Sequence, residues 1–400
     1  MTDQVSMKTD RWLLPEGIAE VLPAQAKQLE LLRRQLLDLY RSWGYDLVMP
    51  PLIEYLDSLL VGTGNDLDLQ TFKIIDQITG RLMGVRADMT PQVARIDAHM
   101  LKCEAPERLC YIGPVLHTRP SGFDRARAPL QVGAELFGHG GPESDAEVLC
   151  LMVETLKSSA IEQIHVDLGH VGIFRGLARD AGLTSEQEVQ LFEALQRKAK
   201  PEIEAYLASW NISTEKSQRL SALVDLNGDE QVLDDAQAIF AGASADVLDS
   251  LENLRQIAAL VRRRLADLPL YFDLAELRGY RYQTGIVFAA FVPGQGQEIA
   301  RGGRYDAIGE SFGRARPATG FSTDLKTLVH LSSLEPQSDL GILAPVVDDR
   351  ALDERVAELR AAGERVIASL PGQEGRISCT ACDRALELQD GQWNVVSLKH

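Results

Sequence analysis

Hydrophobic positions near the beginning of the chain recur at the spacing of an α-helix. Between residues 24 and 43 the leucines at 29, 32, 36 and 39 follow this spacing, and Gly44 comes next as a helix C-cap. Shorter apolar runs bounded by turn-forming residues predict strands instead. We expect strands at residues 46–49, 71–76, 81–86, 108–116, 129–137, 163–167 and 318–321, with 71–76 and 81–86 forming a hairpin, and further helices at 90–101, 143–159 and 323–331.

A second hairpin is predicted within residues 277–306. Residues 286–292 are apolar, β-branched or aromatic and predict a buried strand, 293–296 predict the chain reversal, and 297–300 begin the partner strand. Both ends of this hairpin carry Arg, Tyr and Gly. A buried sheet does not need guanidinium and phenol groups at its ends, whereas a pocket for a small polar molecule does. The alternative is that Gly302-Gly303 forms a tight turn and the neighbouring arginines are solvated.

The pattern also divides the chain into parts. Residues 11–169 and 268–331 alternate strands and helices, and they predict an α+β core with an antiparallel sheet flanked by helices. Residues 170–267 show helical spacing alone, which predicts a helical insertion between sheet strands. Residues 332–338 have the composition of a linker. Residues 339–400 predict a small C-terminal α/β domain.

Composition narrows the class of protein. The chain has 400 residues, of which 45% are hydrophobic and 25% are charged, so more than one domain is expected. It contains no apolar run that could span a bilayer and no signal peptide, and its five cysteines favour a reducing, cytoplasmic environment without disulfides. The net charge of -17 argues against nucleic acid as a partner, because phosphate contacts need clustered Lys and Arg.

Polar residues gather at the expected strand ends. Gln131, Gly133 and Glu135 alternate with apolar neighbours and share one strand face, which is either ordinary solvated surface or part of a binding site. Asp88 and Thr90 lie between a strand and a helix, where a helix cap is the alternative role. Carboxylates would pair with an ammonium group and an arginine with a carboxylate, so the set suits a zwitterionic amino acid.

These motifs resemble those of histidyl-tRNA synthetases. Leu-Arg-Gly at residues 277–279 with Tyr282, and Gly-Gly-Arg-Tyr-Asp at 302–306, are similar to the two histidine-specific motifs of that family. Arg-Ala-Asp-Met-Thr at 86–90 is similar to its Arg-Pro-Glu-Gly-Thr stretch, and residues 131–138 resemble the second strand of class II motif 2. The resemblance covers about residues 14–328 and implies a class II synthetase-like fold. It also implies a histidine pocket made of Asp88, Thr90, Gln131, Glu135, Arg278, Tyr282 and Tyr305.

The chain departs from the synthetase pattern where ATP would bind. His117 stands in place of the motif 2 arginine, Thr327 in place of the motif 3 arginine, and Asp324 adds a negative charge where the triphosphate would lie. Losing both arginine contacts would lower the rate of amino-acid activation by a factor on the order of 10² to 10⁴, unless Arg119, Arg125 or Lys326 compensates in part. Gln283 also replaces a tyrosine of the histidine pocket, which puts the contact to the imidazole in question.

With these departures and its short C-terminal part, the chain resembles the regulatory subunits of ATP phosphoribosyltransferase. The resemblance implies no independent catalysis and no cofactor. It implies a partner, the short-form catalytic transferase subunit, with histidine as the feedback effector in the first step of histidine biosynthesis. It further implies a homodimer, formed around residues 43–51, within a hetero-octamer. The alternatives are an active histidyl-tRNA synthetase-like adenylate-forming enzyme and a stand-alone histidine sensor.

Other candidate motifs carry less weight. Cys379 and Cys382 form a lone Cys-x-x-Cys motif without a second pair of ligands, so no metal site is expected. No Walker-type phosphate-binding loop occurs in the sequence. No catalytic triad is recognisable, so no catalytic residue is assigned.

Overall fold

The computed structural model describes residues 12–61, 65–120, 126–280, 282–333, 340–372 and 382–398. The chain divides into two compact units, residues 1–334 and 335–400, and each is described by itself. The expectations for Arg125, Cys379 and most of the linker lie outside the described residues. Among the described residues, no helix is both long and apolar enough to cross a membrane.

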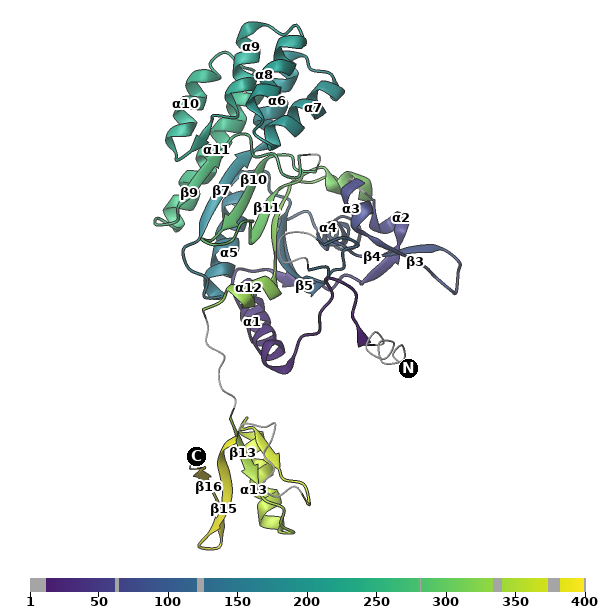
Figure 1. Ribbon diagram of the computed structural model, residues 1–400, viewed down its shortest axis with the longest axis vertical. Coiled ribbons are helices and arrows are strands. Elements are labelled where there is room, and N and C mark those ends of the chain that lie inside the picture. Colours follow the sequence, from purple (N-terminus) through teal and green to yellow (C-terminus); the bar gives the residue numbers. More distant parts are fainter. Residues whose placement is uncertain are drawn as a thin grey trace, which may run out of the picture. The chain divides into compact units, whose positions relative to one another are not determined.

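The first unit is built on a nine-stranded sheet (Figure 1), in the order β1-β5-β6-β12-β11-β10-β7-β9-β8. The strands from β5 to β7 pair antiparallel, whereas β1 pairs parallel with β5 and β7 pairs parallel with β9. The predicted antiparallel sheet flanked by helices is therefore confirmed. The strands are β1 (Asp46–Leu47), β5 (Glu107–Pro114), β6 (Leu130–Phe137), β7 (His165–His170), β8 (Asn227–Gly228), β9 (Leu270–Asp273), β10 (Ile286–Phe291), β11 (Ala300–Arg304) and β12 (Ala318–Asp324).

Helices α1 (Pro23–Ser42), α5 (Pro142–Ser158) and α12 (Leu325–Leu331) contribute to the main core of this unit. The buried side chains of α1 are Leu29, Leu32, Leu36 and Tyr40, which follow the predicted helical spacing. In α5 almost every side chain between Ser144 and Leu156 is buried, because this helix packs against the sheet as well as against α1 and α11. Apolar burial on this scale is the dominant stabilising contribution to the sheet.

The predicted helix at residues 90–101 differs in its second half. Only Thr90–Arg95 (α4) is α-helical, and Ile96–Leu101 continues as a π-helix. This wider turn carries Asp97, which is buried and pairs with Arg316 at 3.0 Å. A local hydrophobic pattern does not report such a π-helical turn, because it depends on a partner more than two hundred residues away.

Between β7 and β9 the chain forms a set of helices that lies together in Figure 1. It also adds the two-residue strand β8 to the sheet edge, which helical spacing over residues 170–267 did not predict. Gly182, with a positive φ of 71°, ends the first of these helices as an αL cap. The helices are α6 (Val171–Ala181), α7 (Ser185–Gln196), α8 (Lys200–Ser209), α9 (Thr214–Ala222), α10 (Gln231–Ile239) and α11 (Ala245–Arg264).

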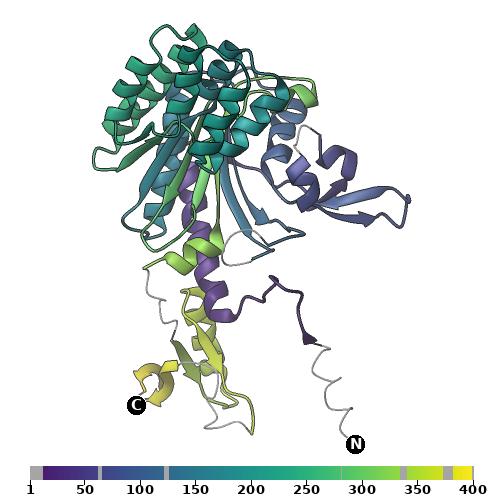
Figure 2. The same ribbon diagram turned by 45° about the horizontal axis from the view of Figure 1, so that its top comes forward.

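A three-stranded sheet lies along the chain between β1 and β5 of the large sheet, and its hairpin projects away from the helical insertion in Figure 2. The hairpin is the predicted one, with Phe72 paired to Val85 and Ile75 to Leu82. Its elements are β2 (Ile53–Tyr55), β3 (Phe72–Ile75), β4 (Leu82–Val85), α2 (Leu56–Leu59) and α3 (Asn65–Gln70).

The second unit is a four-stranded sheet in the order β14-β13-β15-β16 with one helix. Its own core contains Ile342, Leu352, Val356 and Leu386. The elements are β13 (Gly341–Ala344), α13 (Arg350–Ala361), β14 (Val366–Ala368), β15 (Cys382–Gln389) and β16 (Gln392–Ser397).

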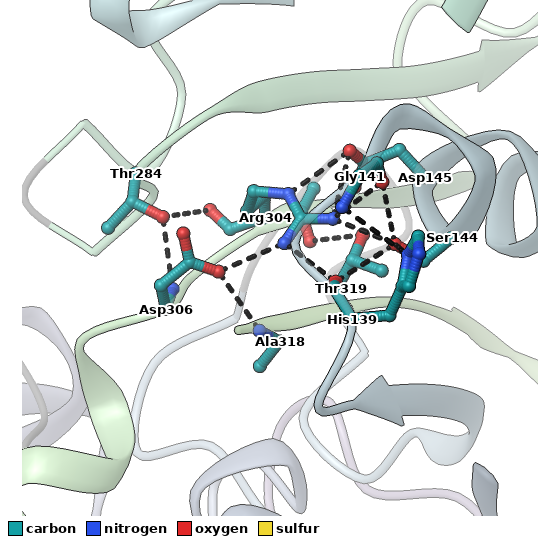
Figure 3. Close-up of polar contacts among 10 residues, drawn as sticks. His139, Gly141, Ser144, Asp145, Thr284, Arg304, Asp306, Ala318 and Thr319 are labelled. Atoms are coloured by element: carbon teal, nitrogen blue, oxygen red, sulfur yellow. Dashed lines mark hydrogen bonds and ion pairs between the residues drawn. The ribbon is translucent and has the colours of Figure 1, made fainter. Parts of the chain in front are cut away.

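A buried ion pair joins β11 to the beginning of α5 (Figure 3). Arg304 and Asp145 lie 3.0 Å apart, and their side chains are only 8% and 1% exposed. Arg304 also donates hydrogen bonds to the Ser144 hydroxyl (2.9 Å) and the His139 carbonyl (3.2 Å). Burial raises the pKa of Asp145, while the charge of Arg304 opposes this shift.

This pair corrects the alternative interpretation of residues 302–303. Both glycines lie inside β11, opposite Phe288 and Val287 of β10, so they do not form a tight turn. Arg304 is buried in the ion pair, whereas Arg301, whose side chain is 70% exposed, is solvated.

We predict that Arg304→Met lowers the free energy of unfolding by about 3–5 kcal/mol, because it leaves the Asp145 carboxylate buried without its partner. The matched control is Arg301→Met on the same strand, which should change stability by less than about 1 kcal/mol because its ion pair is exposed. Urea denaturation of both variants measures the difference. Equal stability of the two variants would contradict the prediction.

Candidate functional site

A cavity of about 840 Å³ lies between the large sheet, α7 of the helical insertion and the turn of the β10–β11 hairpin. Among the residues expected in an amino-acid pocket, Asp88, Gln131 and Tyr282 line it directly. They come from the turn before α4, the beginning of β6 and the loop before β10. The sheet thus brings together segments that are nearly two hundred residues apart in sequence.

Glu135 lies at the centre of the polar network beside this cavity. Its side chain is buried, and Oε1 accepts hydrogen bonds from the hydroxyls of Tyr111 (2.8 Å) and Thr90 (3.1 Å). The hydroxyl of Tyr305 donates to Oε2, and the Tyr305 ring stacks on Tyr282 with 5.0 Å between centroids. Burial raises the pKa of Glu135 to about 8, against the effect of these donors. The interpretation of this strand face as ordinary solvated surface is therefore wrong for Glu135.

Asp88 and Gln131 form a polar pair at the cavity wall. The Gln131 amide donates to Asp88 Oδ1 at 2.8 Å, and its carbonyl oxygen accepts from the Met89 backbone N–H at 3.0 Å. Asp88 Oδ1 also accepts from the Thr90 backbone N–H at 3.0 Å, so the side chain is held at the beginning of α4, although Met89 and not Asp88 is the N-cap residue. The Thr90 hydroxyl is directed to Glu135 instead of capping the helix.

Two glycines make room for the Glu135 network. A Cβ on Gly320 of β12 would collide with Oε2 of Glu135, and a Cβ on Gly133 would collide with the hydroxyl of Tyr111. Tyr111 is opposite Gly133 in the pairing of β5 with β6. Any larger residue at either position would displace the polar groups, because backbone and side chain already fill the space.

Two polar atoms of the cavity wall are buried without a hydrogen-bond partner. They are the Tyr282 hydroxyl and Nδ1 of His117. Nε2 of His117 lies 2.9 Å from the Ala87 carbonyl oxygen, which can only accept, so Nε2 donates this bond and Nδ1 is left without a partner. Leaving such a group unpaired costs about 1–3 kcal/mol, which a ligand with matching polar atoms would recover.

Arg278 lies apart from this group. Its guanidinium contacts the carboxylates of Glu298 at 2.9 Å and Glu276 at 3.3 Å, and it is absent from the described cavity lining. Its predicted role with a ligand carboxylate therefore stays a prediction. Thr90, Glu135 and Tyr305 do not line the cavity themselves. Thr90 contacts the lining residue Asp88 by a hydrogen bond, Tyr305 stacks on the lining residue Tyr282, and Glu135 is reached through Thr90 and Tyr305.

The lining residues Asp88, Gln131 and Tyr282 form the inner part of the cavity. The outer part, whose lining includes His117 and Thr327, is polar and acidic. Glu193, Glu298 and Asp324 line it, and Arg301 is the one lysine or arginine among its described lining residues. Lys326, considered above as a substitute cation, instead donates to the Ala128 carbonyl oxygen at 2.6 Å. Among the residues described, no cluster of three or more His, Cys, Asp or Glu side chains is placed to hold a metal ion.

Sequence reasoning missed Tyr111 and the contribution of α7. Tyr111 could be found only by knowing that it is opposite Gly133, which requires the strand register. Phe192, Glu193 and Gln196 belong to the insertion, and nothing in their local pattern marks them as cavity residues.

We predict that the stability of wild type relative to Glu135→Gln falls as pH rises from about 4.5 to about 8. The folded-state pKa of Glu135 is raised, so over this window the folded protein retains a proton that the unfolded chain loses, and deprotonation costs stability. Gln cannot titrate, so over this pH window wild type should lose roughly 2–4 kcal/mol of unfolding free energy relative to the variant. Urea denaturation across pH measures it, and a pH-independent difference would contradict the assignment of this titration to Glu135.

Comparison with known proteins agrees with the architecture of both units. The family model described as histidyl-tRNA synthetase matches residues 17–328. The model described as the ATP phosphoribosyltransferase subunit HisZ C-terminal domain matches residues 339–396. A solved structure described as an ATP phosphoribosyltransferase regulatory subunit/histidyl-tRNA synthetase from Bacillus halodurans superposes with a TM-score of 0.81 at 28% identity, covering 90% of this chain and 94% of that one.

Sequence relatives match along the entire chain. The ATP phosphoribosyltransferase regulatory subunit of Thioalkalivibrio sulfidiphilus is 60% identical, over 98% of this chain and 99% of that protein. The protein of the same name from Alkalilimnicola ehrlichii is 59% identical, over 98% of each. With this identity over both units, and with the class II synthetase-like sheet and pocket described above, the chain belongs to the family of ATP phosphoribosyltransferase regulatory subunits.

Proposed function

We propose that this chain activates a short-form catalytic ATP phosphoribosyltransferase subunit, mediates its feedback inhibition by histidine and catalyses no reaction of its own. The observation that carries the proposal is an asymmetry within one cavity. The inner part keeps a buried polar network around Glu135 suited to an amino acid. The outer part is acidic, with Arg301 as the one lysine or arginine among its described lining residues.

In this proposal the inner part offers partners for the ammonium and imidazole groups of histidine. The Asp88 carboxylate and the Gln131 amide, 2.8 Å apart, offer acceptors for the α-ammonium group. The unpaired Tyr282 hydroxyl and the Glu135 network offer partners for an imidazole. The proposed histidine-binding residues are Asp88, Thr90, Gln131, Glu135, Arg278, Tyr282 and Tyr305, with Arg278 requiring a change of partner from Glu298.

The outer part explains why no adenylate forms in this proposal. Phosphoryl and nucleotidyl transfer need cationic groups placed on the phosphate charge that develops in the transition state. His117 and Thr327 line the cavity instead, and Asp324 adds a carboxylate. Arg301, whose side chain is 70% exposed, is already near Glu298 at 3.5 Å.

Inhibition by histidine would then follow from thermodynamic linkage between histidine binding and the active and inhibited arrangements of the complex. Histidine can inhibit a complex only if it binds the inhibited arrangement more tightly than the active one, because a ligand with equal affinity for both shifts neither. In this proposal the cavity supplies that difference, since it is formed by elements from three parts of the chain: the sheet, α7 and the β10–β11 turn.

The first test is co-expression with a short-form transferase subunit. We predict that the purified complex forms phosphoribosyl-ATP faster than the transferase alone, that histidine inhibits it, and that its mass is that of a hetero-octamer. The chain alone should show no histidine-dependent ATP–pyrophosphate exchange. Unchanged turnover and unchanged histidine sensitivity would overturn the regulatory proposal, and brisk exchange would favour the synthetase alternative. Co-purification with a different protein would favour the stand-alone sensor.

The second test is histidine binding by calorimetry. We predict that Asp88→Asn weakens binding roughly 10- to 100-fold, because it removes a charge-assisted contact worth about 1.5–3 kcal/mol while keeping the side-chain shape. Asp57→Asn, at an exposed position of α2 outside the cavity, is the control and should bind like wild type. Equal affinity of the two variants would remove Asp88 from the site.

A further inference from the structure

The carboxylate of Asp324 lies in the wall of the outer cavity and is held there by the chain itself. Oδ1 accepts from the backbone N–H groups of Leu130 (2.8 Å) and Lys326 (3.1 Å). Oδ2 accepts from the hydroxyl of Thr327 at 3.1 Å. The two backbone groups can only donate, so this side chain is held as an acceptor.

These contacts occupy three donors beside this part of the wall, the N–H groups of Leu130 and Lys326 and the hydroxyl of Thr327. Backbone N–H groups and a hydroxyl that converge on one point are the groups by which proteins hold anions. Here the anion is an internal carboxylate. The ammonium group of Lys326 is likewise occupied, because it donates to the Ala128 carbonyl at 2.6 Å.

The other acidic residues around the outer cavity also disfavour an anion there. Glu193 and Glu298 add negative charge, and Arg301 is near Glu298 at 3.5 Å. Asp324 differs from the exposed Glu193 because it is partly buried, and burial raises its pKa against the three donors. A partly buried charge is screened less by solvent and salt, so Asp324 repels an anion in the cavity more strongly than a carboxylate on the rim does.

We infer that Asp324 is the specificity-determining residue of the outer cavity, which excludes anionic ligands, phosphates above all, and restricts the site to ligands whose outer end is uncharged or cationic. This inference deepens the proposed function and rests on it for the role of the inner pocket. The inference attributes the exclusion of phosphates to the Asp324 side chain as well as to the lack of arginines.

The test is the binding of inorganic pyrophosphate and of ATP to the full chain, measured by calorimetry at fixed ionic strength. Asp324→Asn keeps an oxygen for the Leu130 and Lys326 N–H groups and removes only the charge. We expect at least a tenfold gain in affinity for both probes over wild type. Glu193→Gln removes the same charge from the rim and should change affinity less than about twofold.

Three results would overturn the inference: tight binding of pyrophosphate or ATP by wild type, no gain in Asp324→Asn, or an equal gain in Glu193→Gln. Circular dichroism and an unchanged urea midpoint establish that the variants are folded, and Asp324→Ser provides a second removal of the charge if the Asn variant is unstable. The readout is separate from the proposed function. Failure to activate a transferase would leave anion exclusion standing, and loss of the anion-exclusion inference would leave the transferase proposal to its own test.

Discussion

The buried pair of Arg304 and Asp145 is the interaction on which the rest of the site depends. It fixes the end of β11 against the beginning of α5, and neither charge can be removed without leaving the other unpaired in the protein interior. The next residue, Tyr305, then points its hydroxyl at Glu135. Asp306 accepts from the Ala318 backbone N–H at 3.0 Å, which ties β12 to the same corner. The contacts that hold β11, β12 and α5 together therefore also position Tyr305 beside Glu135.

A buried carboxyl group such as Glu135 is costly for a fold and useful for a binding site. Its hydroxyl donors offset only part of the desolvation, since burial still raises its pKa to about 8. The nearby Tyr282 hydroxyl is left without a partner. Polar networks that are incompletely satisfied in a protein interior mark places where a ligand can complete them. This is the physical reason for proposing an amino-acid pocket here.

Both parts of the cavity therefore present mainly hydrogen-bond acceptors and negative charge. In the inner part, Asp88 and Gln131 present acceptors that suit an ammonium group. In the outer part, Asp324 occupies donors that an anion would otherwise use. In this proposal a synthetase-like sheet retains recognition of an amino acid but lacks the cationic contacts that would bind nucleotide phosphates. Membership of the regulatory-subunit family is consistent with that division.

The sequence by itself determined the local elements, because helical and strand periodicities are properties of neighbouring residues. It predicted α1, the β3–β4 hairpin and the strand carrying Glu135, and motif resemblance named Asp88, Gln131 and Tyr282, which the fold brings to one cavity. The tertiary structure alone decided the long-range pairings: Tyr111 opposite Gly133, Arg278 with Glu298, and α7 at the cavity wall. Such contacts depend on strand register and on the packing of distant segments, which local side-chain patterns do not encode.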